Sequence, residues 1–134
     1  MKTVTLARTV LLTTAVYDGV LGAVFLVAPQ DALDLVDVPP VNHIGYLQFP
    51  AALLLIFALM FVHAARHPAR HRDLIGYGLL LKLAYLGVAG GHWITAGSRL
   101  PFIWKPFVIA DALFAVLLLT CWWRLRRGAG AKTA

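Results

Sequence analysis

Hydrophobic residues along this chain gather in four long runs, each long enough to form a membrane-spanning helix. About 20 apolar residues are needed to cross roughly 30 Å of hydrocarbon. The four runs predict an all-α fold, an integral-membrane antiparallel four-helix bundle. The predicted spans are Leu6–Val27, Ile44–Val62, Leu74–Ile94 and Phe102–Trp123. They are separated by Pro29 with Pro39 and Pro40, by Arg66–Arg72 around Pro68, and by Gly97 to Pro101.

Two further segments complete the organisation. Gln30–Val38 carries an aspartate at every third position, which favours a short amphipathic helix on the outer surface, although an ordinary acidic loop fits equally well. The spans form one domain over residues 1–127, and we expect a disordered cytoplasmic tail over 128–134. The first run carries Asp18 and is followed by no small-residue cleavage site, so we interpret it as a span and not as a signal peptide.

Composition and charge set the location. The chain is 60% hydrophobic and 13% charged, with a mean hydropathy of +0.78, which excludes a soluble domain. Of the 12 Lys and Arg residues, nine lie on one side of the predicted membrane and two on the other. Because positive residues stay cytoplasmic, we predict a multi-pass protein of the inner membrane with both termini in the cytoplasm. Basic residues of this kind face anionic lipid, so we expect no nucleic-acid partner.

Few residues suit a cofactor or metal. Cys121 is the single cysteine, which excludes an intramolecular disulfide and a CxxC redox pair. His63, His67 and His71 are spaced four apart, but Pro68 interrupts the helix and neighbouring arginines repel a cation, so a headgroup-binding loop is the preferred interpretation. We predict no metal site and no cofactor. Motifs typical of hydrolases, metalloproteases and nucleotide-binding proteins do not occur in the sequence.

Small residues predict where helices approach closely. Ala15, Gly19 and Ala23 form a small-xxx-small row in the first span, and Gly87 with Gly91 forms another in the third. We expect close backbone contact at both rows.

Three ionisable residues fall inside the predicted spans, where each costs about 2.5–3.5 kcal/mol on insertion scales. They are Asp18, Lys82 and Asp111. At 1.5 Å per residue, both aspartates lie about 13 Å from the outward ends of their spans and Lys82 about 18 Å. We therefore predict that the Lys82 ammonium lies between the two carboxylates, leaving a net charge of −1 or one protonated aspartate. Such a triad could form a binding site or could only fix helix register.

Neighbouring residues extend the candidate site. Tyr85 and Ala89 share the helix face of Lys82, and His92 lies near that face further outward. Gln48 faces the outer half of the second span. Tyr17 adjoins Asp18 but points about 100° away around the helix, so it ranks below the others.

The order of these features resembles that of small four-span bacterial inner-membrane proteins of the DoxX-like kind. The resemblance covers nearly the whole chain and rests on Ala28-Pro29, on Arg66-His67-Pro68, on Lys82 in the third span, and on Ala110–Phe114 in the fourth. DoxX-like relatives include subunits associated with quinone-linked oxidoreductases. The absence of cysteine pairs departs from a redox role, and no catalytic site is carried over from the resemblance.

The leading hypothesis is a membrane protein that binds an amphipathic small molecule, a quinone or isoprenoid-like lipid, in a polar pocket around the three charges. Such a protein could serve as an accessory subunit. One alternative is a membrane-embedded acid–base enzyme of the cyclase, isomerase or hydrolase type, with Asp18 and Asp111 as acid and base. Another is a proton-coupled small transporter, which would need to dimerise. Expected partners are membrane lipid and a lipophilic ligand, with a homodimer or larger membrane complex left open.

Overall fold

The computed structural model describes residues 2–96 and 102–130, and helices dominate the described chain. The α-helices are α1 (Lys2–Val27), α2 (Pro29–Leu35), α3 (Gly45–Arg66), α4 (Arg72–Tyr85), α5 (Gly91–Ala96) and α6 (Trp104–Gly130), and a π-helical turn, η1 (Leu86–Gly90), joins α4 to α5. The predicted all-α fold is confirmed. The predicted breaker at 97–101 lies outside the described residues.

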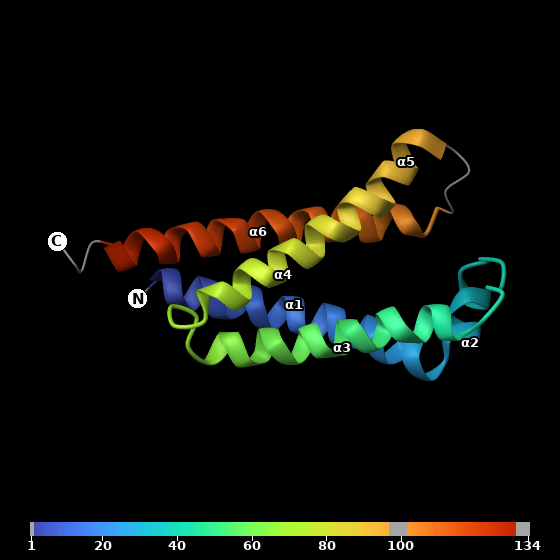
Figure 1. Ribbon diagram of the computed structural model, residues 1–134, viewed down its shortest axis with the longest axis horizontal. Coiled ribbons are helices and arrows are strands. Elements are labelled where there is room, and N and C mark those ends of the chain that lie inside the picture. Colours follow the sequence, from blue (N-terminus) through green and yellow to red (C-terminus); the bar gives the residue numbers. More distant parts are fainter. Residues whose placement is uncertain (1, 97–101, 131–134) are drawn as a thin grey trace.

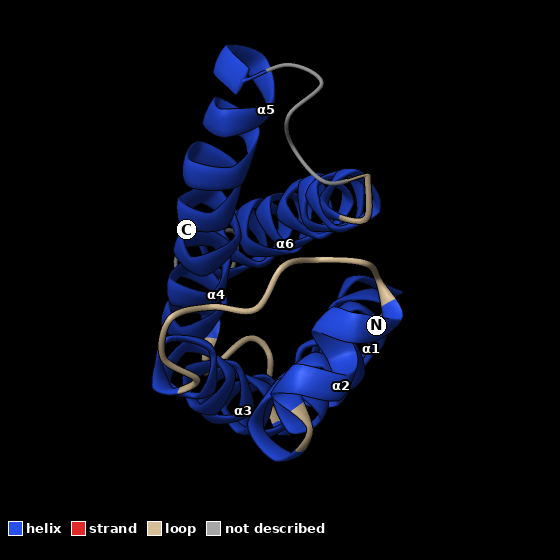
Figure 2. Cartoon of the chain, turned by 90° about the vertical axis from the view of Figure 1, so that its right-hand side faces the viewer, coloured by secondary structure: helices blue, strands red, loops and turns tan. Residues whose placement is uncertain are grey.

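Four antiparallel spans form the bundle (Figure 1). They are α1, α3, α6 and the continuous segment Arg72–Thr95 made of α4, η1 and most of α5. The helix α1 packs against α3 along its length, α4 packs against α6, and α1 also contacts α6, so two helix pairs close on each other (Figures 1 and 2). We call the end formed by Lys2, the Arg66–Arg72 turn and Arg124–Arg127 the basic end, and the opposite end the α2 end.

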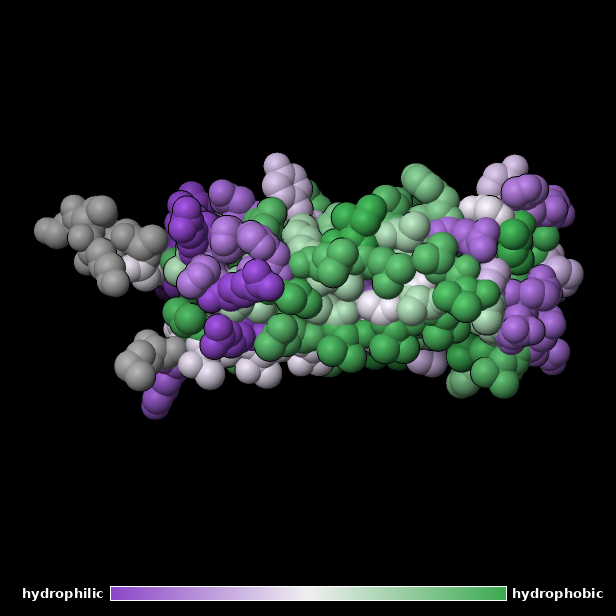
Figure 3. All heavy atoms as spheres, turned by 90° about the horizontal axis from the view of Figure 1, so that it is seen from below, coloured by the Kyte–Doolittle hydropathy of each residue, from purple (hydrophilic) through white to green (hydrophobic). Residues whose placement is uncertain are grey.

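The outer surface of the bundle is apolar around its middle. Large hydrophobic side chains on all four spans stay exposed, including Val16 at 65%, Ile56 at 60%, Leu80 at 59% and Val116 at 61%. On the face shown in Figure 3, hydrophobic residues cover the middle and hydrophilic residues gather at both ends. A water-soluble monomer rarely shows such a continuous apolar surface, whereas lipid tails would cover it. The chain is therefore a multi-pass membrane protein.

The core near the basic end is built from small and branched residues around one aromatic ring. Phe61 is fully buried, and Leu11, Ile75 and Leu118 pack around it. At this level α4 approaches α3 closely, because Gly78 leaves room for the Phe61 ring: a Cβ on Gly78 would lie 2.5 Å from Phe61 Cζ. Gly22 similarly allows α1 to approach α3, since its Cβ would lie 2.8 Å from the Ala51 carbonyl oxygen.

The predicted glycine contacts are only partly correct. Gly19 faces Ala58, with 3.6 Å between a built Cβ and the alanine Cβ. The prediction for Gly87 and Gly91 is wrong, because nothing lies within 4 Å of a Cβ at either position. Gly87 belongs to η1 and Gly91 follows it directly. The wide turn changes the direction in which the later residues point.

The short segment after α1 is helical over Pro29–Leu35, as the amphipathic interpretation predicted. Its side chain Leu33 is buried and Leu35 is 88% exposed. At the other end of the chain α6 continues to Gly130, so the first three residues of the predicted disordered tail are helical. Residues 131–134 lie outside the described part.

Candidate functional site

The three ionisable residues predicted to meet inside the membrane do meet. Lys82 Nζ on α4 lies 2.5 Å from Asp18 Oδ1 on α1 and 2.9 Å from Asp111 Oδ1 on α6. All three are buried, with exposed fractions of 0% for Asp18, 1% for Lys82 and 6% for Asp111. We call these residues the triad. It ties together three of the four spans.

Each member of the triad occupies a core position of its helix. Asp18 continues the buried row of α1 that includes Thr14 and Ala15. On α4 the buried positions are Ile75, Gly78 and Lys82, spaced at helical intervals. Because close packing at Gly78 brings α4 toward α3 one turn earlier, the lysine stem enters the core and its ammonium reaches both carboxylates.

The hydrogen bonding of the triad is uneven. Lys82 Nζ donates a hydrogen bond to Asp18 Oδ1. The contact with Asp111 Oδ1 is within ion-pair distance, but it lacks hydrogen-bond geometry. As a result, Asp18 Oδ2 and Asp111 Oδ1 are buried oxygens without a hydrogen-bond partner. Buried acceptors without a donor are costly, so this site is short of donors.

Aromatic rings complete the surroundings of the ammonium. Lys82 Nζ lies 5.0 Å from the centroid of the Tyr17 ring and 5.7 Å from that of Phe114, and the two rings are 5.1 Å apart. These distances allow cation–π attraction. The low ranking of Tyr17 was therefore wrong. Its position next to Asp18, and that of Phe114 three residues after Asp111, were the available signals.

Of the other predicted site residues, Tyr85 faces Asp111, whereas Gln48 and His92 lie apart from these charges. Tyr85 stacks on Trp104 with ring centroids 6.5 Å apart, near the start of α6. Gln48 donates a hydrogen bond from Nε2 to the Leu26 carbonyl oxygen over 3.1 Å, which links the start of α3 to the end of α1. His92 is exposed on α5. Gln48 and His92 thus belong to the α2 end of the bundle.

A groove lies between α5 and the first half of α6. It encloses about 540 Å³, and its lining is almost entirely apolar. The lining residues are Trp93, Phe102, Lys105, Pro106, Ile109, Ala110 and Leu113. Lys105 Nζ lies 5.8 Å from the Trp93 ring centroid and 5.7 Å from that of Phe102, at the α2 end of the groove. No member of the triad lines this groove, although Ala110 directly precedes Asp111.

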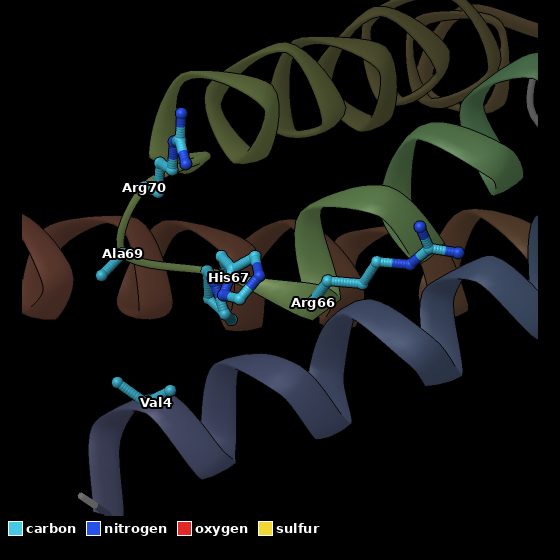
Figure 4. Close-up of a pocket in the computed structure, with 6 residues that line it drawn as sticks. Val4, Arg66, His67, Ala69 and Arg70 are labelled. Carbon is cyan, nitrogen blue, oxygen red and sulfur yellow. The ribbon is translucent and has the colours of Figure 1, made fainter.

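A second pocket, of about 330 Å³, lies at the basic end between the start of α1 and the turn before α4 (Figure 4). Its lining residues are Val4, Arg66, His67, Pro68, Ala69 and Arg70. In Figure 4 the guanidinium groups of Arg66 and Arg70 extend away from each other.

Three histidines gather beside that pocket. The ring centroids of His63 and His71 are 4.6 Å apart, and those of His67 and His71 are 6.5 Å apart. Partial removal from water lowers the pKa of His71 from its ordinary value of 6.5, and the positive charges of His63 and Arg70 lower it further. Within residues 2–96 and 102–130, no three His, Cys, Asp or Glu side chains are arranged to hold a metal ion.

No family model, curated protein or solved structure matches this chain.

Proposed function

We propose that this multi-pass membrane protein binds an amphipathic small molecule, of the quinone or isoprenoid-lipid class, in the groove along α6. The observation that carries the proposal is an apolar groove of about 540 Å³ with one cationic side chain, Lys105, at its end. Ligand sites in membrane bundles commonly combine an apolar lining with a few polar groups that fix orientation.

The dimensions of the groove suit a lipid chain. Leu113 lies eight residues after Lys105 on α6, which corresponds to about 12 Å at 1.5 Å per residue. One leaflet of a bilayer contributes about 15 Å of hydrocarbon, half of the total. An apolar tail that enters beside Lys105 would therefore lie along α6 down to the level of the triad.

The polar end of the groove suits an oxygen-bearing head. The Lys105 ammonium is held near the Trp93 and Phe102 rings and keeps donors for a carbonyl or phosphate oxygen. Tryptophan and lysine are both favoured at the membrane–water boundary, where such a head would lie. With both termini in the cytoplasm, as the charge distribution predicts, this end faces outward, and the membrane is the inner one.

This location differs from the one expected from sequence. The hypothesis placed the ligand around the triad, but the three charges pack against one another and against Tyr17 and Phe114. The proposed ligand lies beside the triad, next to Ala110. A role as an accessory subunit, and the kinship with DoxX-like proteins, remain part of the proposal.

The test is to fill the groove with a side chain. Ala110→Trp places an indole inside it, while Val116→Trp adds the same bulk to a position of α6 that is 61% exposed and outside the lining. Both variants and the unmodified protein are purified in mild detergent, and retained lipophilic molecules are extracted and identified by mass spectrometry.

We expect the unmodified protein and Val116→Trp to retain the same enriched species and Ala110→Trp to lose it. Lys105→Gln should weaken retention without abolishing it, because the apolar lining stays intact. Equal retention by the two tryptophan variants, or no enriched species in the unmodified protein, would refute the proposal.

A further inference from the structure

The charges of the triad do not balance. Two carboxyl groups face one ammonium, and all three side chains are at most 6% exposed. Among the residues that the structure describes, the other titratable groups that face them are two phenols, Tyr17 on α1 and Tyr85 on α4, and neither brings positive charge. With both carboxyls ionised, an uncompensated negative charge would remain in the hydrocarbon, which is costly.

The hydrogen bonds of the triad independently indicate that a proton is missing from the site. Asp18 Oδ2 and Asp111 Oδ1 are buried acceptors without a hydrogen-bond partner. An ionised carboxylate can only accept, whereas a protonated carboxyl group supplies one O–H donor. One added proton therefore removes the excess charge and also supplies a donor that the site lacks.

The two aspartates are not equivalent. Asp18 is fully buried and accepts the hydrogen bond from Lys82, so its negative charge is directly paired. Asp111 makes a longer contact without hydrogen-bond geometry and keeps 6% exposure. Ionisation is thus favoured at Asp18, and the proton belongs to the less well paired acid.

We propose that the triad is an intramembrane proton-binding site, in which Asp111 holds one proton at neutral pH while Lys82 and Asp18 form an ion pair. The proton is taken from water and returns to water, and its loss changes the triad from neutral to a net charge of −1. This site is distinct from the groove, and it would stand if the groove bound nothing.

The composition of the chain allows a direct spectroscopic test. The acidic side chains number six, all of them aspartate, and the four outside the triad are exposed: Asp31, Asp34, Asp37 and Asp73. Water stabilises the charged form of an exposed carboxyl group, whereas burial in hydrocarbon favours the protonated form. In infrared spectra, the carbonyl stretch of a protonated carboxyl group is therefore expected from the triad alone.

Charge balance predicts a definite series at neutral pH. The unmodified protein should show one protonated carboxyl group, Asp111→Asn none, and Lys82→Met two, because no cation then remains. Asp18→Asn should also show none, since Asp111 then takes over the lysine as its partner. Asp73→Asn is the control and should leave the signal unchanged. A missing signal in the unmodified protein would overturn the proposal even if a variant failed to fold.

Stability tests the assignment to Asp111. Asparagine resembles a protonated aspartate, so Asp111→Asn should keep the unfolding midpoint of the unmodified protein in detergent. Asp18→Asn removes the paired charge and should lower that midpoint. The reverse order would assign the proton to Asp18 and overturn the proposal as stated.

Discussion

Gly78 fixes the distance between α4 and α3, and replacing it with alanine tests how closely the two helices pack. The added Cβ would lie 2.5 Å from Phe61 Cζ and closer still to Cε1. Phe61 is fully buried, so its ring has no free space to move into. Overpacking of this kind costs about 1–3 kcal/mol. Alanine regains up to about 1 kcal/mol of helix propensity, so we expect a net loss of about 1–2 kcal/mol.

Unfolding in mild detergent, followed by the helical circular dichroism signal during titration with a denaturant, measures this loss. Gly87→Ala is the matched control, because nothing lies within 4 Å of its Cβ and only the propensity gain remains. In a Phe61→Leu background the cost of Gly78→Ala should largely disappear, which gives a coupling free energy of about 1 kcal/mol or more. If Gly78→Ala were as stable as Gly87→Ala, the close contact would not exist and the reasoning would be wrong.

Two further predictions concern the basic end. Arg8 Nε donates a hydrogen bond to the Ala65 carbonyl oxygen over 3.1 Å, so Arg8→Met should destabilise the protein by about 1 kcal/mol, measured by the same unfolding titration. His71 should titrate below 6.5 by NMR, because burial first, and then the charges of His63 and Arg70, disfavour its protonated form. Because folding lowers the pKa of His71, the folded state is favoured at a pH above 6.5, and this stability is lost as the pH falls. Acidification should therefore destabilise the unmodified protein more than His71→Gln. Equal acid sensitivity of the two proteins would contradict this account.

The spans were predictable because hydropathy reports which residues lie in lipid. The ends of the helices were harder to predict: α6 runs to Gly130, past the predicted boundary at Trp123. An apolar window marks where the hydrocarbon ends, but a helix continues into water as long as its backbone bonds are kept and no proline intervenes. Arg124, Arg126 and Arg127 lie beyond the predicted boundary, carry charge and are still helical.

The triad was predictable for a different reason. Charged groups inside hydrocarbon must find partners, and depth along each helix can be counted from the sequence. Rotation about the helix axis cannot be counted in the same way once a helix departs from 3.6 residues per turn. This explains the wrong prediction at Gly87, which belongs to the π-helical turn. The low ranking of Tyr17 failed for another reason: α1 is a regular helix, and the large Tyr17 ring still approaches the Lys82 ammonium to 5.0 Å from a neighbouring direction. The contact of Gly78 with Phe61 depends on how α4 crosses α3.

The π-helical turn between α4 and α5 makes Lys82 and Trp93 point in different directions from the same transmembrane segment. In an uninterrupted α-helix, Trp93 lies 11 residues after Lys82 and would point within about 20° of it, toward the interior. One extra residue in a turn rotates everything that follows by roughly 100°. The wide turn therefore lets a single transmembrane segment present its lysine to the charged interior and its tryptophan to the groove on α6. If the same residues instead formed a regular α-helix of unchanged length, the two side chains would lie in line and the indole would leave the groove.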